Sequence, residues 1–280
     1  MKPLHLTAFT VAATSATPYI PPWLTLPPAP ELPPPSYEAH AQVNNISLWH
    51  ALYGPSVGMA GPPVVLLHGG KISSRWWGDL VEYLAPTFSV IVIDTRAHGR
   101  STNDLSVPLS YDLFARDTIS LLDTLGITSA SFVGWSDGAN TALDIAMNYS
   151  SRADSIIAFG ANFSPDQANI TGIEGIPFLN DLLNREESEY NELNPNPNWI
   201  LFNDRVNQMQ SVSPAWDQRA FNTISPFGVV DPSPRILCAD ADHEEVVIRS
   251  TVFQINEMIQ NSQLTVLPGV SHFATLVTAQ

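Results

Sequence analysis

The stretch that decides the fold of this chain is residues 132–140, which read Phe-Val-Gly-Trp-Ser-Asp-Gly-Ala-Asn. Its centre has the form G-x-S-x-G, with Gly134 and Gly138 on either side of Ser136. In such a motif the serine sits on a strained turn between a strand and a helix, with its hydroxyl exposed. Both glycines are needed because the turn brings the two backbones so close that a Cβ would clash. A β-prone run precedes the turn and a helix-forming run follows it, so Ser136 is our candidate nucleophile.

Strand and helix signals alternate on both sides of this turn. Short apolar runs predict strands at residues 64–67, 89–93, 131–133, 155–159, 236–239 and 264–267. Helix-forming segments lie at residues 73–84, 111–125, 139–148 and 246–259. A hairpin is predicted at residues 43–52, with Asn44 and Asn45 at its turn. Because near-continuous apolar runs are typical of a parallel sheet covered on both faces, we expect an α/β fold with a mostly parallel central sheet flanked by helices, over residues 36–160 and 235–280.

The alternation of strand and helix signals is interrupted at residues 161–234, which predict a helical cap over the site. Helical stretches are expected at residues 178–192, 199–209 and 214–221. The segment contains many large apolar residues, which either line an apolar pocket or pack the cap onto the body: Phe178, Leu182, Trp199, Phe202, Met209, Trp216, Phe221 and Phe227. It also holds more carboxylates than arginines, which disfavours anionic substrates.

The N-terminal part divides into two segments. Residues 1–17 are a candidate signal peptide, with one lysine, a moderately apolar stretch and small residues near its end. Nine prolines crowd residues 18–35, which predicts an extended linker that contributes nothing to the core. Together with N-x-[ST] sequons at Asn45, Asn148, Asn162 and Asn169, these features favour a secreted glycoprotein over the alternative, a cytoplasmic protein.

Charge and composition exclude several classes of partner. The chain of 280 residues has a formal net charge of −15 and only two lysines, so it should repel nucleic acid and anionic membrane surfaces. It contains no apolar tract long enough to span a membrane, and its single cysteine excludes an intrachain disulfide. We expect a small-molecule substrate and neither a cofactor nor a metal; the oligomeric state stays open.

A serine hydroxyl is a poor nucleophile until a base takes its proton, and the base needs an anion to fix its tautomer. His272 follows the last predicted strand, at the carboxyl edge where the reactive groups of an open α/β sheet collect. His68 and His98 also follow strands, but they precede the nucleophile in the chain. His272 is therefore our candidate base. The acid should come from residues 240–245, Asp-Ala-Asp-His-Glu-Glu, where the choice among carboxylates stays open.

Four motifs together resemble the α/β-hydrolase superfamily. They are His68-Gly69-Gly70, Asp94-x-Arg96-x-His98-Gly99-x-Ser101, Gly134-x-Ser136-x-Gly138 and Pro268-Gly269-x-x-His272-Phe273. The closest resemblance is to small esterase-like proteins that carry a Trp-Ser-Asp-Gly nucleophile elbow. It covers about residues 45–273 and is specific as to fold but not as to substrate. It implies the chain order nucleophile, acid, histidine.

The resemblance narrows the acid to two residues. In that superfamily the acid usually closes a Gly-x-x-Asp turn about 28 residues before the histidine. Here the turn reads Ala-Asp-His-Glu, with both ends replaced. Spacing favours Glu244, 28 residues before His272, whereas residue type favours Asp242, 30 residues before it. We favour Glu244. The chain also ends eight residues after His272, where relatives continue into a helix.

An oxyanion hole needs two preorganised N–H groups. One is the amide of Asp137, the residue after the nucleophile, and the resemblance implies Gly70 as the other. The carboxylate of Asp137 should turn away from the hole, since it would oppose an oxyanion. Asp94 and Arg96 are expected to hold their own turn together rather than to catalyse.

These residues predict a serine hydrolase that cleaves carboxylic esters or lactones of apolar, uncharged substrates through an acyl-enzyme. Two alternatives stay open. The same triad could serve a carbon–carbon bond hydrolase or a perhydrolase, and the same fold could form a catalytically inactive binding protein.

Overall fold

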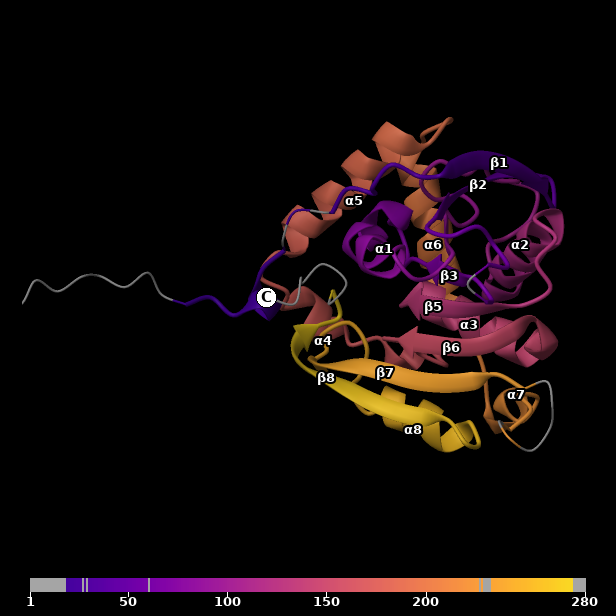
Figure 1. Ribbon diagram of the computed structural model, residues 1–280. Coiled ribbons are helices and arrows are strands. Elements are labelled where there is room, and N and C mark those ends of the chain that lie inside the picture. The colour runs from indigo at the N-terminus through magenta and orange to yellow at the C-terminus, as the bar shows by residue number, and fades with distance from the viewer. Residues whose placement is uncertain are drawn as a thin grey trace, which may run out of the picture.

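The computed structural model describes residues 19–26, 28, 30–59, 61–226, 228 and 233–273. The candidate signal peptide and Phe227 lie outside these residues. Within them, eight strands form one sheet in the order β1-β2-β4-β3-β5-β6-β7-β8 (Figure 1). The strands are β1 (Tyr37–Val43), β2 (Ile46–Tyr53), β3 (Val64–Leu67), β4 (Val90–Ile93), β5 (Ala130–Trp135), β6 (Ala153–Phe159), β7 (Arg235–His243) and β8 (Gln263–Ser271).

The pairing of the strands indicates where in the sheet a ligand site is expected. The hairpin β1–β2 is antiparallel, and β2 pairs antiparallel with β4. All pairings from β4 through β8 are parallel, so the predicted mostly parallel sheet is confirmed. The chain leaves β3 toward β4 on one side and leaves β5 toward β6 on the other. In open α/β sheets, ligands bind at the carboxyl ends of the strands on either side of such a switch point.

Helices cover both faces of the sheet, as the apolar strands predict. The helices outside the cap are α1 (Gly78–Leu84), α2 (Tyr111–Thr124), α3 (Asp137–Asn148) and α8 (Thr251–Met258). Along β3, Val65 and Leu67 belong to the core cluster under α2, α3 and α8, whereas Leu66 belongs to the cluster on the opposite face with Trp76 and Val81. Alternate side chains of one strand therefore fill two separate cores.

The segment predicted as a cap contains four α-helices among its described residues: α4 (Ile170–Glu174), α5 (Leu179–Leu193), α6 (Trp199–Val212) and α7 (Gln218–Phe221). Helices α4 and α5 lie beyond the arrowheads of the parallel strands (Figure 1). The expected helix at residues 214–221 begins only at Gln218, because the side chain of Asp217 accepts hydrogen bonds from the amides of Arg219 and Ala220 and caps the helix there.

The proline-rich segment packs against the domain, so the expectation that it contributes nothing to the core is wrong. Trp23 stacks on His243 with a centroid separation of 4.0 Å, and Leu26 and Leu32 pack against the core cluster that contains Leu66 and Trp76. A Cβ on Gly78 would lie 2.5 Å from the carbonyl oxygen of Glu31, so the segment closely approaches α1. Proline keeps this chain extended, but an extended chain can still bury its apolar side chains.

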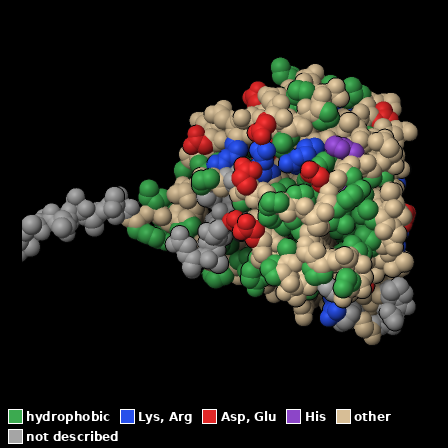
Figure 2. Space-filling model, turned by 45° about the horizontal axis from the view of Figure 1, so that its top comes forward, with side chains coloured by type: hydrophobic (Ala, Val, Ile, Leu, Met, Phe, Trp, Pro, Cys, Tyr) green, Lys and Arg blue, Asp and Glu red, His purple; other side chains and the backbone are tan. Residues whose placement is uncertain are grey.

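Basic side chains on the surface are mostly paired. On the face shown in Figure 2 most of them gather in one band with carboxylates beside them. Arg75 lies 2.8 Å from Glu192, and Arg100 lies 2.9 Å from Asp94. In the described ranges, no helix is both long and apolar enough to cross a membrane. Two of the four sequons, at Asn45 and Asn148, present exposed asparagines, and secretion stays a prediction.

Candidate active site

Ser136 occupies the turn between β5 and α3 in a strained conformation, with φ 55° and ψ −120°. A Cβ on Gly138 would lie 2.0 Å from the carbonyl oxygen of Leu67, and a Cβ on Gly134 would lie 2.2 Å from the carbonyl oxygen of Gly138. Neither glycine could therefore be replaced without moving backbone. The amide of Ser136 donates to the carbonyl of Phe159 at 2.9 Å, which ties the turn to the neighbouring strand.

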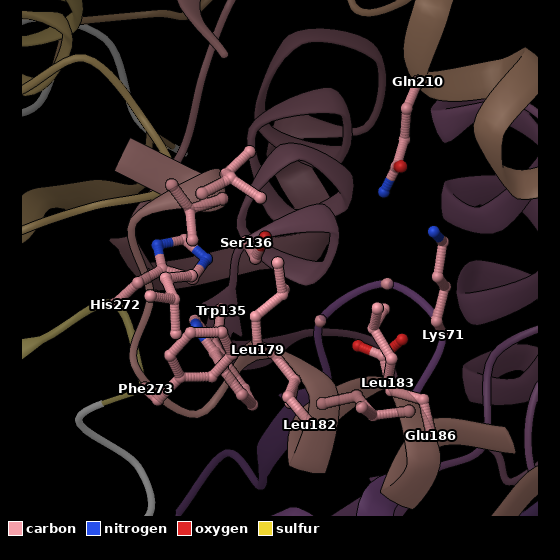
Figure 3. Close-up of a pocket in the computed structure, with 16 residues that line it drawn as sticks. Lys71, Trp135, Ser136, Leu179, Leu182, Leu183, Glu186, Gln210, His272 and Phe273 are labelled. Carbon is pink, nitrogen blue, oxygen red and sulfur yellow. The ribbon is translucent and has the colours of Figure 1, made fainter. Parts of the chain in front are cut away.

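His272 follows β8, and its Nδ1 lies 2.8 Å from Oε2 of Glu244. Both residues are 2% exposed. The other carboxylate oxygen of Glu244 accepts hydrogen bonds from the amides of Val246 and Val247, at 2.7 and 2.8 Å, so its orientation is fixed. The remaining ring nitrogen of His272 faces the side chain of Ser136 (Figure 3).

Asp242, the alternative acid, does not contact the imidazole. Its Oδ1 accepts hydrogen bonds from the amides of Gly269 and Val270, at 2.8 and 3.3 Å. Asp242 thus holds the loop that leads to His272, while Glu244 holds the ring itself. The structure brings together the pair that spacing favours.

Gly160, which sequence reasoning missed, makes room for the histidine. It follows β6 with φ 64°, and a Cβ there would lie 2.7 Å from Cε1 of His272. The only signal in the sequence is a glycine directly after a strand at the carboxyl edge of the sheet.

The buried charges around His272 favour its protonated form. Burial alone would lower the pKa of the imidazole, but the carboxylates around it, Glu244 foremost, together outweigh burial and raise it. Burial likewise opposes the charged form of Glu244, and the imidazole overcomes it and lowers the pKa of that carboxyl. Beside them, burial and the charge of Glu244 raise the pKa of Asp240.

The candidate oxyanion donors lie at the switch point between β3 and β5. The amide of Asp137 belongs to the first turn of α3, and Gly70 lines the pocket beside Ser136. The carboxylate of Asp137 is held by the hydroxyl of Tyr111 at 2.8 Å and by Nε2 of Gln210 at 2.9 Å. A Cβ on Gly70 would lie 2.4 Å from that carboxylate, so a larger residue there would require the carboxylate to move. The role of these two amides stays a prediction.

A pocket of about 180 Å³ opens above Ser136 and His272. Most of its wall is apolar and comes from the cap and the flanking loops: Ile72, Trp135, Ile173, Ile176, Leu179, Leu182, Leu183, Val246 and Phe273. Its polar lining includes Lys71, Glu186 and Gln210.

Of the large apolar cap residues singled out in the sequence that the structure describes, only Leu182 lines this pocket. Phe178, Phe202, Met209 and Phe221 are buried in the core clusters instead. Most of the described residues of this set therefore pack the cap onto the body, which is one of the two roles that the sequence left open. The aromatic positions of the cap face the body of the protein, and aliphatic residues that carried no separate signal face the pocket.

The other motif residues support the scaffold. Asp94 accepts hydrogen bonds from Ser74 and Arg100, and Arg96 forms a buried ion pair with Asp117 at 2.6 Å. His98 is buried in contact with Phe202, and burial lowers its pKa to about 3. None of these side chains lines the pocket. The part of the chain that the structure describes holds no group of three or more His, Cys, Asp or Glu arranged to bind a metal ion.

Residues 62–222 match the family described as alpha/beta hydrolase fold. This match covers more than half of the chain and agrees with the sheet order and the strand–turn–helix geometry around Ser136. The chain belongs to the alpha/beta hydrolase fold family.

Curated relatives match over shorter stretches. The chain is 34% identical over 110 residues to "Putative carbamate hydrolase RutD" of Caulobacter segnis, which covers 39% of this chain and 41% of the relative. It is 30% identical over 112 residues to pimeloyl-(acyl-carrier protein) methyl ester esterase of Pectobacterium atrosepticum, which covers 40% and 42% of the two chains. The matched part thus spans about two fifths of the length of these relatives.

Two solved structures are similar over most of the chain. The meta-cleavage product hydrolase CumD of Pseudomonas fluorescens IP01 superimposes with a TM-score of 0.67 at 21% identity, covering 86% of this chain and 92% of the other. The enol-lactonase of Burkholderia xenovorans LB400 gives a TM-score of 0.63 at 20% identity, with coverages of 84% and 93%. At these identities the likeness shows the fold alone.

Proposed function

We propose that this protein is a serine hydrolase that cleaves carboxylic esters or lactones of apolar, uncharged substrates. The observation that carries the proposal is the arrangement of His272, whose Nδ1 lies 2.8 Å from Glu244 and whose other ring nitrogen faces Ser136 inside a pocket (Figure 3). A serine on a strained turn, an imidazole and a buried carboxylate in this order form the machinery of nucleophilic acyl transfer.

In the proposed reaction, the hydroxyl of Ser136 attacks the carbonyl carbon while His272 takes its proton. The negative charge develops on the carbonyl oxygen, where the amides of Asp137 and Gly70 stabilise it by about 3 kcal/mol each. His272 then gives the proton to the leaving alcohol, and an acyl-enzyme remains. Water, activated by the same imidazole, releases the acid. Glu244 stays ionised throughout and fixes the tautomer of His272.

The lining of the pocket supports an apolar acyl or alcohol group, because aliphatic side chains of the cap and Phe273 form most of its wall. The names of two similar proteins agree with acyl transfer, since one is a methyl ester esterase and the other an enol-lactonase.

Carbon–carbon bond hydrolysis is the second candidate. It is supported by the likeness to a meta-cleavage product hydrolase and by 32% identity over 130 residues to a 2-hydroxy-6-oxononadienedioate/2-hydroxy-6-oxononatrienedioate hydrolase of Burkholderia vietnamiensis. Both reactions use the same three side chains. Only assays with an ester and with a dienedioate substrate can therefore distinguish ester hydrolysis from carbon–carbon bond hydrolysis.

Hydrolysis of p-nitrophenyl acetate and butyrate by the purified protein tests the proposal. We expect turnover in the wild type and a fall of at least about 10³ in kcat in Ser136→Ala, because triad residues act as a unit. Equal rates in the two proteins would show that Ser136 is not the nucleophile. An absence of turnover on these esters, with cleavage of a dienedioate substrate, would favour the second candidate, and inactivity on both would favour a binding protein.

A further inference from the structure

Glu186 is a buried carboxylate whose role the proposed triad does not explain. It lies on α5, it is only 8% exposed, and it lines the pocket on the side away from His272 (Figure 3). Its Oε2 has no hydrogen-bond donor among the described residues. Buried carboxylates are normally paired, because desolvating an unpaired charge is costly.

Glu189, one turn further along α5, shows what a structural carboxylate looks like in this helix. Its two oxygens accept hydrogen bonds from the hydroxyl of Ser73 at 2.5 Å and from Nε1 of Trp76 at 3.0 Å. Glu189 therefore holds the cap against the body. Oε2 of Glu186 has no such partner within the described residues, and this carboxylate faces the pocket (Figure 3).

Two further polar side chains line the same pocket. Lys71 extends from the loop after β3, and Gln210 comes from α6 (Figure 3). Burial raises the pKa of Glu186 to about 7, and the positive charge of Lys71 opposes that rise. No hydrogen bond or ion pair joins Lys71 to Glu186 within the described part of the chain, and Oε2 of Glu186 remains available to a third group.

Resting on the proposed function, we propose that the substrate carries a hydroxyl group beside its ester bond, which donates to Glu186 and accepts from Lys71. An ammonium group would be repelled by Lys71, and a carboxylate would be repelled by Glu186. A hydroxyl satisfies both residues at once and adds no net charge. The apolar wall of the pocket then holds the other side of the ester.

Matched pairs of esters test this proposal, each pair differing by a hydroxyl in place of a methyl group. The acyl-side pair is propyl 3-hydroxybutyrate and propyl 3-methylbutyrate, and the alcohol-side pair is 2-hydroxyethyl butyrate and propyl butyrate. We expect the wild type to prefer the hydroxy member of at least one pair by roughly tenfold in kcat/KM, the scale of one hydrogen bond to a charged group.

Variants at neighbouring positions of α5 test whether Glu186 causes the preference for the hydroxy ester. Glu186→Leu should reduce the ratio of kcat/KM between the two members of the preferred pair roughly tenfold, whereas Glu187→Leu, the same change on the exposed side of α5, should keep it. Glu186→Gln retains the shape and a neutral acceptor, and should give an intermediate ratio even where the leucine variant folds poorly.

Equal kcat/KM within both pairs, or a preference that survives Glu186→Leu, would overturn the proposal about the hydroxyl while ester hydrolysis itself stands. Turnover of no ester in either pair, with no difference between wild type and Ser136→Ala, would instead overturn the proposed function and this inference with it.

Discussion

Glu244 contacts the imidazole of His272, although an aspartate two residues earlier matches the residue type more common at that point of the motif. The longer side chain reaches from the loop after β7 to the ring, and its second oxygen binds two amides of the same loop. Asp242 instead accepts hydrogen bonds from the amides of Gly269 and Val270. The two carboxylates therefore have different structural roles, and mutating each of them separately can distinguish these roles.

We predict that Glu244→Gln lowers kcat for p-nitrophenyl butyrate by about 10³–10⁴, because an amide cannot hold the imidazole in the required tautomer. Asp242→Asn should lower it less than about tenfold, since its carbonyl oxygen can still accept from the loop amides. Steady-state kinetics on both variants measures the difference. The reverse ranking would assign the triad acid to Asp242.

The pH dependence of activity follows from the same pair. The base must be neutral to accept a proton from Ser136, and Glu244, working against burial, raises the pKa of His272 above 6.5. We therefore predict that kcat/KM falls as the pH decreases through an apparent pKa above that value. In Glu244→Gln burial is no longer outweighed, so the residual activity should extend to lower pH. A wild-type midpoint below 6.5 would contradict this electrostatic account.

At the level of elements, the apolar runs predict where the strands lie, but they do not predict the polar residues at the ends of β7 and β8. Strands β7 and β8 continue to His243 and Ser271, beyond the predicted residues 236–239 and 264–267, because backbone pairing between them does not depend on apolar side chains. Helix α8 was expected from residue 246 and begins at Thr251. The amides of Val246 and Val247 bind Glu244 instead, which delays the helix and orients the acid.

The hairpin β1–β2, helix α2 and the turn after β4 are joined by one buried cluster. Asp117 accepts two hydrogen bonds from Arg96, at 2.6 and 2.8 Å, and one from Asn44 at 2.9 Å. We predict that Asp117→Ala lowers the free energy of unfolding by about 3–5 kcal/mol, because it leaves a buried guanidinium unpaired.

The matched control is Asp112→Ala on the same helix, where the ion pair with Arg116 is more than half exposed on both side chains. Removing it should cost less than about 1 kcal/mol. Urea denaturation of the two variants compares them directly, and equal losses would show that the buried cluster does not hold these elements together.

For the molecule as a whole, the sequence predicted the fold and the residues around the reaction, because both depend on local patterns and on chain order. Ser136 and His272 each follow a predicted strand, and a parallel sheet brings the carboxyl ends of its strands to one edge. The polar side of the pocket could not be predicted. Lys71, Glu186 and Gln210 come from a loop and two cap helices, and only tertiary packing places them together.

The proline-rich segment is the other feature that only the whole molecule reveals. The sequence predicts a linker that contributes nothing to the core, but Trp23 stacks on His243 beside the acid loop, and Leu26 and Leu32 bury apolar surface. Each of these leucines stabilises the fold by up to about 1.5–3 kcal/mol on full burial, and both are only partly buried.

We therefore predict that a chain beginning at Ser36 melts at least about 5 °C below a chain beginning at Tyr19, at about 2–4 °C per kcal/mol for a domain of this size. The comparison uses two truncated chains, so residues 1–18 do not enter the difference. A full-length Trp23→Ala variant separates the stacking on His243 from the contribution of the leucines, and should lower the melting temperature less than the truncation does. Calorimetry measures all three proteins. Equal melting temperatures for the two truncated chains would show that residues 19–35 do not stabilise the fold and act only as a linker.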